Sequence, residues 1–324
     1  MKCAITGALS YSGRYLAASL LSKGHDVVNL SRRGVPIAPE PLSAPQARAL
    51  GTHRVRLDFN DVDAMARSLE GCDVLFSTYW VRFADRGESP HSIAAANCAR
   101  LWEAAKRAGV RKIVMASHTR TSVDSPFPYI AGKATADAAL RDSGVNYAIV
   151  RPCGIFGDTA AESILMNNAA WVLRRSPLFL LAGDGSHRFQ PVHVRDIADL
   201  MEELGTSLQT SGEELDACGP DSPTAMELFT KLRDASGGMA RIAAAGPLLS
   251  TATITALTKP IDWLTGDTLL DADDLDLLTS GLTVADAPDD PRIKARRSLF
   301  EWIEAQGRDL GRSYVSSVER YYSN

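Results

Sequence analysis

The sequence predicts an α/β protein in which a doubly wound parallel sheet is followed by a smaller, mostly helical C-terminal lobe. Short apolar runs alternate with amphipathic helical stretches through the first half of the chain. Strands that are apolar along their whole length belong in a parallel sheet with helices on both faces. A glycine-containing turn joins the first apolar run to the first helical stretch. After Pro152 the alternation gives way to helical segments separated by turn-rich stretches.

The individual elements follow from hydrophobic periodicity. In the first half, strands are predicted over residues 2–6, 26–30, 53–58, 72–78, 112–117 and 146–152, and helices over 12–23, 62–69, 92–108 and 129–143. A proline-rich stretch at 34–45 interrupts this pattern. In the second half, helices are predicted near 164–174, 195–204, 225–235, 271–280 and 298–305.

These elements divide the chain into two parts. We expect a first domain over residues 1–155, to which residues 187–218 return, and a second lobe over 156–186 and 219–324. A chain of 324 residues has the length for two domains, or for one large α/β unit with an added lobe.

Composition narrows the classes of function. The formal net charge of -4 gives no reason to expect a nucleic-acid partner, so we expect a small-molecule substrate. No apolar run reaches the length of a membrane span, and membrane insertion is not expected. The five cysteines lack a Cys-x-x-Cys pair and predict reduced thiols in a cytoplasmic compartment, or in an organelle matrix or stroma if a presequence was removed. Six scattered histidines offer no metal site.

The turn after the first strand is the first candidate binding site. Gly7 and Gly13 flank it, and Ser10 stands where such a turn usually carries another glycine. A helix that starts directly after a strand can present free backbone amides to a pyrophosphate, with Tyr11 and Ser12 in its first turn. The alternative is a tight turn without a ligand, and the backbone angles of Ser10 are the open question, because serine adopts positive φ reluctantly.

The end of the second strand bears on the choice of nucleotide. An acidic residue at this point would hold an adenosine ribose hydroxyl. The chain instead has Ser31, Arg32 and Arg33, a hydroxyl and two guanidinium groups suited to a 2′-phosphate, so NADP(H) is expected as the cofactor. The alternative is a pair of solvated arginines. Asp58, at the end of the third strand, is placed to contact the adenine amine or to stabilise a turn.

Tyr129 and Lys133 are the candidate catalytic pair, because residues four apart share one face of a helix. A neighbouring ammonium favours the phenolate and brings the pKa of a tyrosine toward the range of a general acid or base. Lys133 is also expected to bind the nicotinamide ribose of the cofactor. Ser117, at the carboxyl end of its strand, is placed to polarise a substrate carbonyl. Its rivals for that task are Thr119, Thr121 and Ser122. The alternative for the pair is an exposed helix surface.

Weaker candidates for substrate contact lie in both parts of the chain. Tyr79 and Trp80 follow the fourth strand and are expected beside the nicotinamide, or else in an aromatic wall under the second lobe. Asn167 and Asn168 occur in the first helix of the lobe and are expected to face the substrate.

Several ordered motifs together resemble one superfamily. The order of TG-x-x-x-x-x-G, "MAS", "YIAGK", "RPCGIFG", "GDGSHRFQPVHVRDIADL" and "ACGPDSP" is similar to that of the short-chain dehydrogenase/reductases (SDR), in their extended and atypical branches. Those branches include nucleoside-diphosphate-sugar epimerases, NmrA-like proteins and the SDR accessory subunit of respiratory complex I. The resemblance covers residue 1 to about residue 235. It implies a Rossmann fold, cofactor binding by Gly7, Gly13, Arg32 and Asp58, and catalysis by the Tyr129 and Lys133 pair with Ser117.

The sequence therefore predicts an NADP(H)-binding oxidoreductase that acts on a carbonyl/alcohol pair of a small molecule. Two alternatives remain open: an NADPH-binding accessory subunit or NmrA-like redox sensor without catalysis, and, less favoured, a sugar-nucleotide epimerase. A homodimer or membership of a larger assembly is compatible with all three. The departures from the family pattern are Ser10, His118 after Ser117, and a short connection from Ser117 to Tyr129.

Overall fold

The computed structural model describes residues 1–31, 40–81, 90–246, 250–267, 272–286 and 296–316. Two compact units are present. Unit 1 comprises Met1–Pro152 and Val194–Ala217, and unit 2 comprises Cys153–His193 and the described residues from Cys218 onward. Among the described helices, none combines the length and the apolar character needed to cross a membrane.

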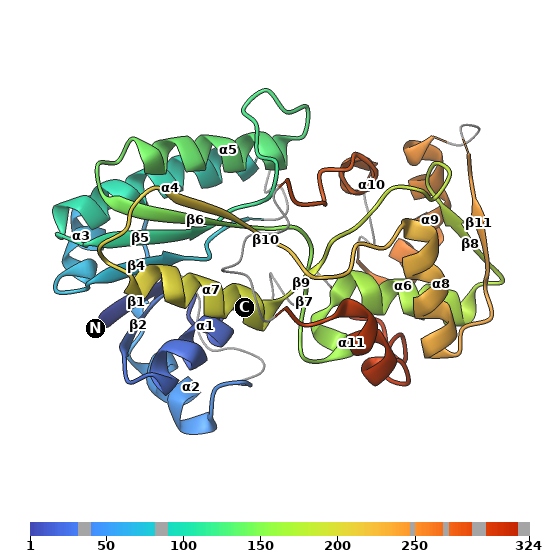
Figure 1. The fold of residues 1–324 in the computed structure, drawn as a ribbon, viewed down its shortest axis with the longest axis horizontal. Helices are drawn as coiled ribbons and strands as arrows, with labels where there is room; N and C mark the ends of the chain where they lie inside the picture. The colour runs from blue at the N-terminus through green and yellow to red at the C-terminus, as the bar shows by residue number, and fades with distance from the viewer. Residues whose placement is uncertain (32–39, 82–89, 247–249, 268–271, 287–295, 317–324) are drawn as a thin grey trace. The chain divides into compact units, whose positions relative to one another are not determined.

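Unit 1 is built on a seven-stranded parallel sheet with the order β10-β6-β5-β4-β1-β2-β3 (Figure 1). The strands are β1 (Lys2–Thr6), β2 (Asp26–Ser31), β3 (Val55–Arg56), β4 (Val74–Ser77), β5 (Lys112–Ala116), β6 (Asn146–Pro152) and β10 (Glu213–Ala217). Every neighbouring pair is parallel, as the doubly apolar strands predict. The predicted α/β fold is confirmed.

Helices cover both faces of this sheet. They are α1 (Tyr11–Ser22), α2 (Ala44–Thr52), α3 (Val62–Leu69), α4 (Pro90–Arg107), α5 (Pro128–Arg141) and α7 (Val194–Thr206). In Figure 1, α3, α4 and α5 lie on one side of the sheet, and α1 and α7 lie on the other. Leu101 and Trp102 of α4 are fully buried against the sheet with Leu75 and Ile113. This apolar core holds α4 and α5 at the strand ends where the candidate catalytic residues occur.

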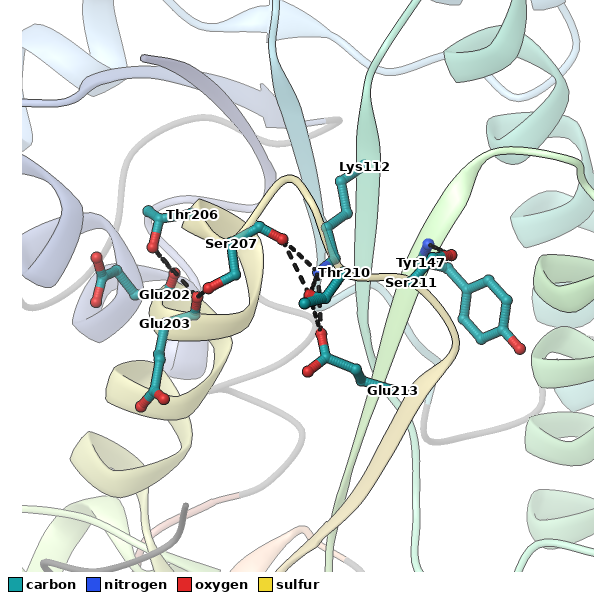
Figure 2. A network of polar contacts seen from close by, with 9 residues as sticks. All are labelled: Lys112, Tyr147, Glu202, Glu203, Thr206, Ser207, Thr210, Ser211 and Glu213. Atoms are coloured by element: carbon teal, nitrogen blue, oxygen red, sulfur yellow. Dashed lines mark hydrogen bonds and ion pairs between the residues drawn. The ribbon is translucent and has the colours of Figure 1, made fainter.

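The last strand of the sheet comes from a segment that leaves unit 1 after β6 and returns at α7. β10 then pairs with β6 in register from Glu213 opposite Ala148 to Ala217 opposite Pro152. Figure 2 shows how the segment is held: the ammonium of the fully buried Lys112 donates to the Ser207 carbonyl (3.0 Å), the Thr210 hydroxyl (3.0 Å) and the Glu213 carboxylate (3.1 Å). Lys112 therefore links β5 to the returning segment.

Unit 2 contains helices and two small parallel sheets. Its elements are β7 (Ile155–Phe156), the 3-10 helix η1 (Ala160–Glu162), α6 (Ile164–Arg175), β8 (Leu178–Leu181), β9 (Val192–His193), α8 (Ala225–Ser236), β11 (Arg241–Ala244), α9 (Thr251–Thr265), α10 (Ala272–Thr279) and α11 (Leu299–Gln306). β11 pairs with β8, and β7 pairs with β9. Leu173, Leu232 and Ile303 bring α6, α8 and α11 together in one apolar core.

The structure contains elements that periodicity does not predict. α2 begins inside the tract that was expected to be irregular, because Ser43 caps it, Gln46 completes a capping box, and Pro45 occupies its first turn. The two-stranded sheet of β8 and β11 and the helix α9 are also absent from the prediction. By contrast, α3 and β6 have the predicted bounds.

Candidate cofactor and catalytic site

The turn between β1 and α1 is shaped by its two glycines. Gly7 has φ +69°, a conformation that side-chain-bearing residues rarely adopt, and its amide donates to the Leu30 carbonyl at 2.7 Å. A Cβ on Gly13 would lie 2.0 Å from the Gly7 carbonyl oxygen. Any side chain at position 13 would therefore push α1 away from the turn. This close approach gives the turn a backbone cradle that fits a pyrophosphate.

Ser10 fits this turn without strain. Its backbone is extended, with φ -74° and ψ 174°, so Ser10 does not need the positive φ that serine adopts reluctantly. Within this turn, Gly7 is the residue with positive φ. Ser10 is the N-cap of α1, and its hydroxyl accepts a hydrogen bond from the Gly13 amide at 3.3 Å. Tyr11 and Ser12 are half-buried in the first turn, which has no acidic residue. The N-terminus of α1 can thus receive an anion.

The structure describes only part of the segment that is predicted to favour NADP(H) over NAD(H). Ser31 is the last residue of β2 and is half-buried, whereas Arg32 and Arg33 lie outside the described residues. The Asp58 carboxylate accepts from the Asn60 amide at 3.0 Å, a local turn contact. The role of Asp58 toward adenine stays a prediction.

Lys133 is held in an unusual environment on α5. Only 4% of it is exposed, and its ammonium donates to the Ala116 carbonyl at 2.9 Å. The same ammonium lies 4.2 Å from the centre of the Trp80 ring, a cation–π contact. Burial lowers the pKa of Lys133 to about 8. The side chain is therefore mostly charged at pH 7 and titrates close to the physiological range.

Among the described residues, three aromatic rings stand around Tyr129. Trp80, His91 and His118 approach it edge-on, with ring centres 6.1, 5.3 and 5.5 Å away. Trp80 and His91 are nearly parallel to one another. His91 comes from α4, which can approach this closely because Gly132 faces it: a Cβ on Gly132 would lie 2.9 Å from the His91 Cβ. The Tyr129 ring is thus oriented by its neighbours.

Both histidines beside Tyr129 are neutral at pH 7. Burial lowers the pKa of His118 to about 4, and its Nδ1 donates to the Thr119 carbonyl at 2.7 Å. Burial, together with the Lys133 charge, lowers the pKa of His91. His91 is a site residue that the sequence does not predict, because nothing local in the sequence signals its contact with Tyr129. For His118, the signal was its position directly after Ser117.

The hydroxyls that end β5 differ in what they contact. The Thr119 hydroxyl donates to Asp216 at 3.2 Å, and the Thr121 hydroxyl donates to Asp137 at 3.0 Å. Both are occupied by carboxylates. Ser117 is 3% exposed and lies close enough to Asp137 to lower the pKa of that carboxyl, but its hydroxyl makes no well-aligned hydrogen bond to any described residue. Of the three, Ser117 is the hydroxyl best able to turn toward a bound oxygen.

The weaker candidates have clear structural contacts. The Tyr79 hydroxyl accepts from the Asn97 amide at 3.0 Å, and its ring packs on Phe59. In unit 2, Asn167 and Asn168 are both 2% exposed. Their side-chain amides form hydrogen bonds of 2.9 to 3.0 Å with the backbone of residues 311–315. These contacts anchor the C-terminal segment and give no support to a substrate role for the two asparagines.

Comparisons with known proteins agree with this arrangement. A family model described as NAD(P)H-binding matches residues 7–170, which includes the glycine turn and the Tyr129 region. The chain is 26% identical over 242 residues to the mitochondrial NADH dehydrogenase [ubiquinone] 1 alpha subcomplex subunit 9 of Dictyostelium discoideum, a match over 74% of this chain and 65% of that protein. The matching part thus spans just under two thirds of that relative.

Solved structures share the fold. The NADPH-dependent quinone oxidoreductase QOR2 of Escherichia coli has a TM-score of 0.69 and 21% identity, over 94% of this chain and 99% of that chain. A nucleoside-diphosphate-sugar epimerase of Staphylococcus aureus has a TM-score of 0.68 and 19% identity, over 94% of this chain and all of that chain (100%). The resemblance to a subunit of complex I is confirmed in sequence, and the nucleoside-diphosphate-sugar epimerase shares the fold. With the matching model spanning half of its length, the chain belongs to the NAD(P)H-binding family of Rossmann proteins.

Proposed function

We propose that this chain is an NADP(H)-dependent oxidoreductase that interconverts a carbonyl and an alcohol on a small molecule. The observation that carries the proposal is the buried Lys133 one helical turn after Tyr129, beside Ser117 at the carboxyl end of β5. Ligands of open parallel sheets bind at the carboxyl ends of the strands. The glycine turn follows β1 at the same end of the same sheet.

The residues around Tyr129 suit a proton-transfer step. NADPH, when bound, supplies the hydride. In the reducing direction, the Tyr129 hydroxyl donates its proton to the substrate oxygen, and the Ser117 hydroxyl holds that oxygen by a hydrogen bond. The Lys133 ammonium stabilises the phenolate that remains. His91 and His118 stay neutral and add no charge that would compete with Lys133.

The preference for NADP(H) over NAD(H) rests on Arg32 and Arg33 at the end of β2. A guanidinium binds a phosphate in a planar, two-pronged geometry that a ribose hydroxyl does not require. The quinone oxidoreductase that shares this fold was solved with NADPH. We propose a reducing compartment for the chain, either the cytoplasm or an organelle, since one relative is mitochondrial.

A second candidate function is a non-catalytic NADPH-binding subunit of a larger assembly. Two observations favour it: the similarity to a subunit of NADH dehydrogenase, and the indole of Trp80 lying on the Lys133 ammonium, which reduces the access of other groups to that charge. Sugar-nucleotide epimerisation is the least supported, because the described helix α6 offers basic residues only in its last turn for a diphosphate.

The Tyr129→Phe variant separates the first two functions. We expect its NADPH consumption with a panel of aldehydes, ketones and quinones to fall by a factor of about 100 or more, because general acids contribute about 10² to 10⁴. NADPH affinity, measured by fluorescence titration, should stay within about twofold. Tyr147→Phe is the matched control: Tyr147 is half-buried near the start of β6, and the variant should behave as wild type.

Equal turnover of the variant and the wild type would remove Tyr129 from the reaction. A wild-type protein that binds NADPH, consumes none with any acceptor and co-purifies with a large complex would support the accessory-subunit function instead.

A further inference from the structure

A carboxylate that the proposed reaction does not use lies one turn beyond Lys133. Asp137 is fully buried, and with Tyr129 and Lys133 it continues one face of α5. A carboxylate buried without compensation costs several kcal/mol of solvation, so its retention inside the protein requires partners.

Three groups surround the Asp137 carboxylate besides Lys133. The Thr121 hydroxyl donates to its Oδ2 at 3.0 Å, and the Arg151 Nε lies 3.9 Å from the same oxygen. The Ser117 hydroxyl lies beside it as well. Burial raises the pKa of Asp137, while Ser117, Arg151, Thr121 and Lys133 each oppose that rise by favouring the ionised form.

Arg151 is itself held from the opposite side. It pairs with Glu214 of β10, and Glu214 accepts two hydrogen bonds from Arg141 at 2.6 and 2.9 Å. The Arg141 contacts lower the pKa of Glu214. Acidic and basic side chains therefore alternate from Asp137 through Arg151 and Glu214 to Arg141. Lys133 precedes Asp137 by one turn of α5.

Asp137 is the one carboxyl group among the described titratable groups that act on Lys133. From α4, Cys98 is a neutral thiol because burial raises its pKa to about 12, and His91 is neutral. His118, after β5, is neutral too. The remaining contacts of the ammonium are the Ala116 carbonyl and the Trp80 ring.

We propose that Asp137 is a positioning residue of this site, whose buried carboxylate keeps Lys133 in the ammonium form beside Tyr129. The catalytic meaning of this assignment rests on the proposed function. The effect of Asp137 on the protonation of Lys133 does not depend on that function, because it is a property of the ligand-free chain and is measurable without any substrate.

The test is a pH titration of Lys133 by NMR in protein labelled at the lysine Cε, with the Lys133 signal assigned from its loss in Lys133→Met. In Asp137→Asn we expect the titration midpoint to fall by about one unit or more, because side chains four apart on a helix are neighbours and an opposite charge within about 4–6 Å shifts a pKa by about 1 to 3 units. Asp137→Glu, which keeps the charge, should restore the midpoint to within about half a unit.

The matched control is Asp142→Asn, which removes a carboxylate from the exposed end of the same helix and should leave the midpoint in place. An unchanged midpoint in folded Asp137→Asn, or an equal fall in Asp142→Asn, would overturn the proposal.

Thr121→Val provides a second route if Asp137→Asn does not fold. Loss of the Thr121 hydroxyl should raise the pH at which Asp137 takes up its proton, and the Lys133 signal should report this as an acid inflection displaced upward from that of wild type. An acid inflection that does not move would contradict the coupling. A shifted lysine in a protein that reduces no substrate would leave the coupling intact and refute only the proposed reaction.

Discussion

Unit 1 contains two buried lysines whose ammonium groups have different surroundings. The Lys112 ammonium donates hydrogen bonds to three oxygens, one of them in the carboxylate of Glu213 (Figure 2). Lys133 has one carbonyl and the face of an indole, and its pKa falls to about 8. A fully coordinated buried cation is part of the architecture. A buried cation with few oxygen partners can still stabilise the negative charge of another group. Such cations are typical of functional sites.

The largest expected effect is on the architectural lysine. Lys112→Met should lower the free energy of unfolding by about 3–5 kcal/mol, because Glu213 would be left partly buried without its cation and the returning segment would lose its anchor. Urea denaturation monitored by circular dichroism measures this. A loss of less than about 1 kcal/mol would show that Lys112 is dispensable and would break the comparison.

Lys133→Met should behave in the opposite way. We expect a loss of unfolding free energy of less than about 1 kcal/mol at pH 7, since removing the buried charge also removes its desolvation cost and Asp137 keeps Arg151 and Thr121 as partners. The folded pKa of about 8 lies below the ordinary 10.5, so the unfolded chain binds more protons between these values. Wild-type stability should therefore rise from pH 8 toward 10.5 through this group, and Lys133→Met should lack that rise. Denaturation curves across this pH range test it.

The smallest expected effect concerns a third cation, Arg32. It should change the affinity for the nucleotide and leave the free energy of unfolding unchanged. Arg32→Ala should weaken NADPH binding by about tenfold and NADH binding by much less, because only NADPH carries the 2′-phosphate. Arg48→Ala, on the exposed face of α2, is the control. Equal losses of affinity for NADPH and NADH would show that Arg32 does not bind the 2′-phosphate. The comparison would then rest on the two lysines.

The sequence predicts what depends on local spacing. The glycine turn, the parallel strands and the pairing of Tyr129 with Lys133 on one helix face all follow from neighbours within a few residues. Asp137, four residues after Lys133, had the same signal and could have been found. The bounds of α3 and β6 are accurate because apolar periodicity and flanking turns agree there.

What the sequence does not predict depends on contacts between distant segments. His91 reaches Tyr129 only because Gly132 lets α4 and α5 approach closely. The Thr119 hydroxyl is less suited than Ser117 to hold a substrate oxygen because it donates to Asp216. That contact exists only because β10 returns to pair with β6. The burial that lowers the pKa of Lys133 is a property of the assembled core, which periodicity indicates without giving its depth.

The return of the chain as β10 has a consequence for biosynthesis. Glu214 and Asp216, which support Arg151 and the Thr119 hydroxyl, emerge from the ribosome only after the whole excursion from Cys153 to His193 has been made. A nascent chain that ends before Glu213 leaves β6 as an open edge and lacks these two carboxylates. The neighbourhood of Tyr129 is thus completed late, when more than half of the polypeptide is already outside the ribosome.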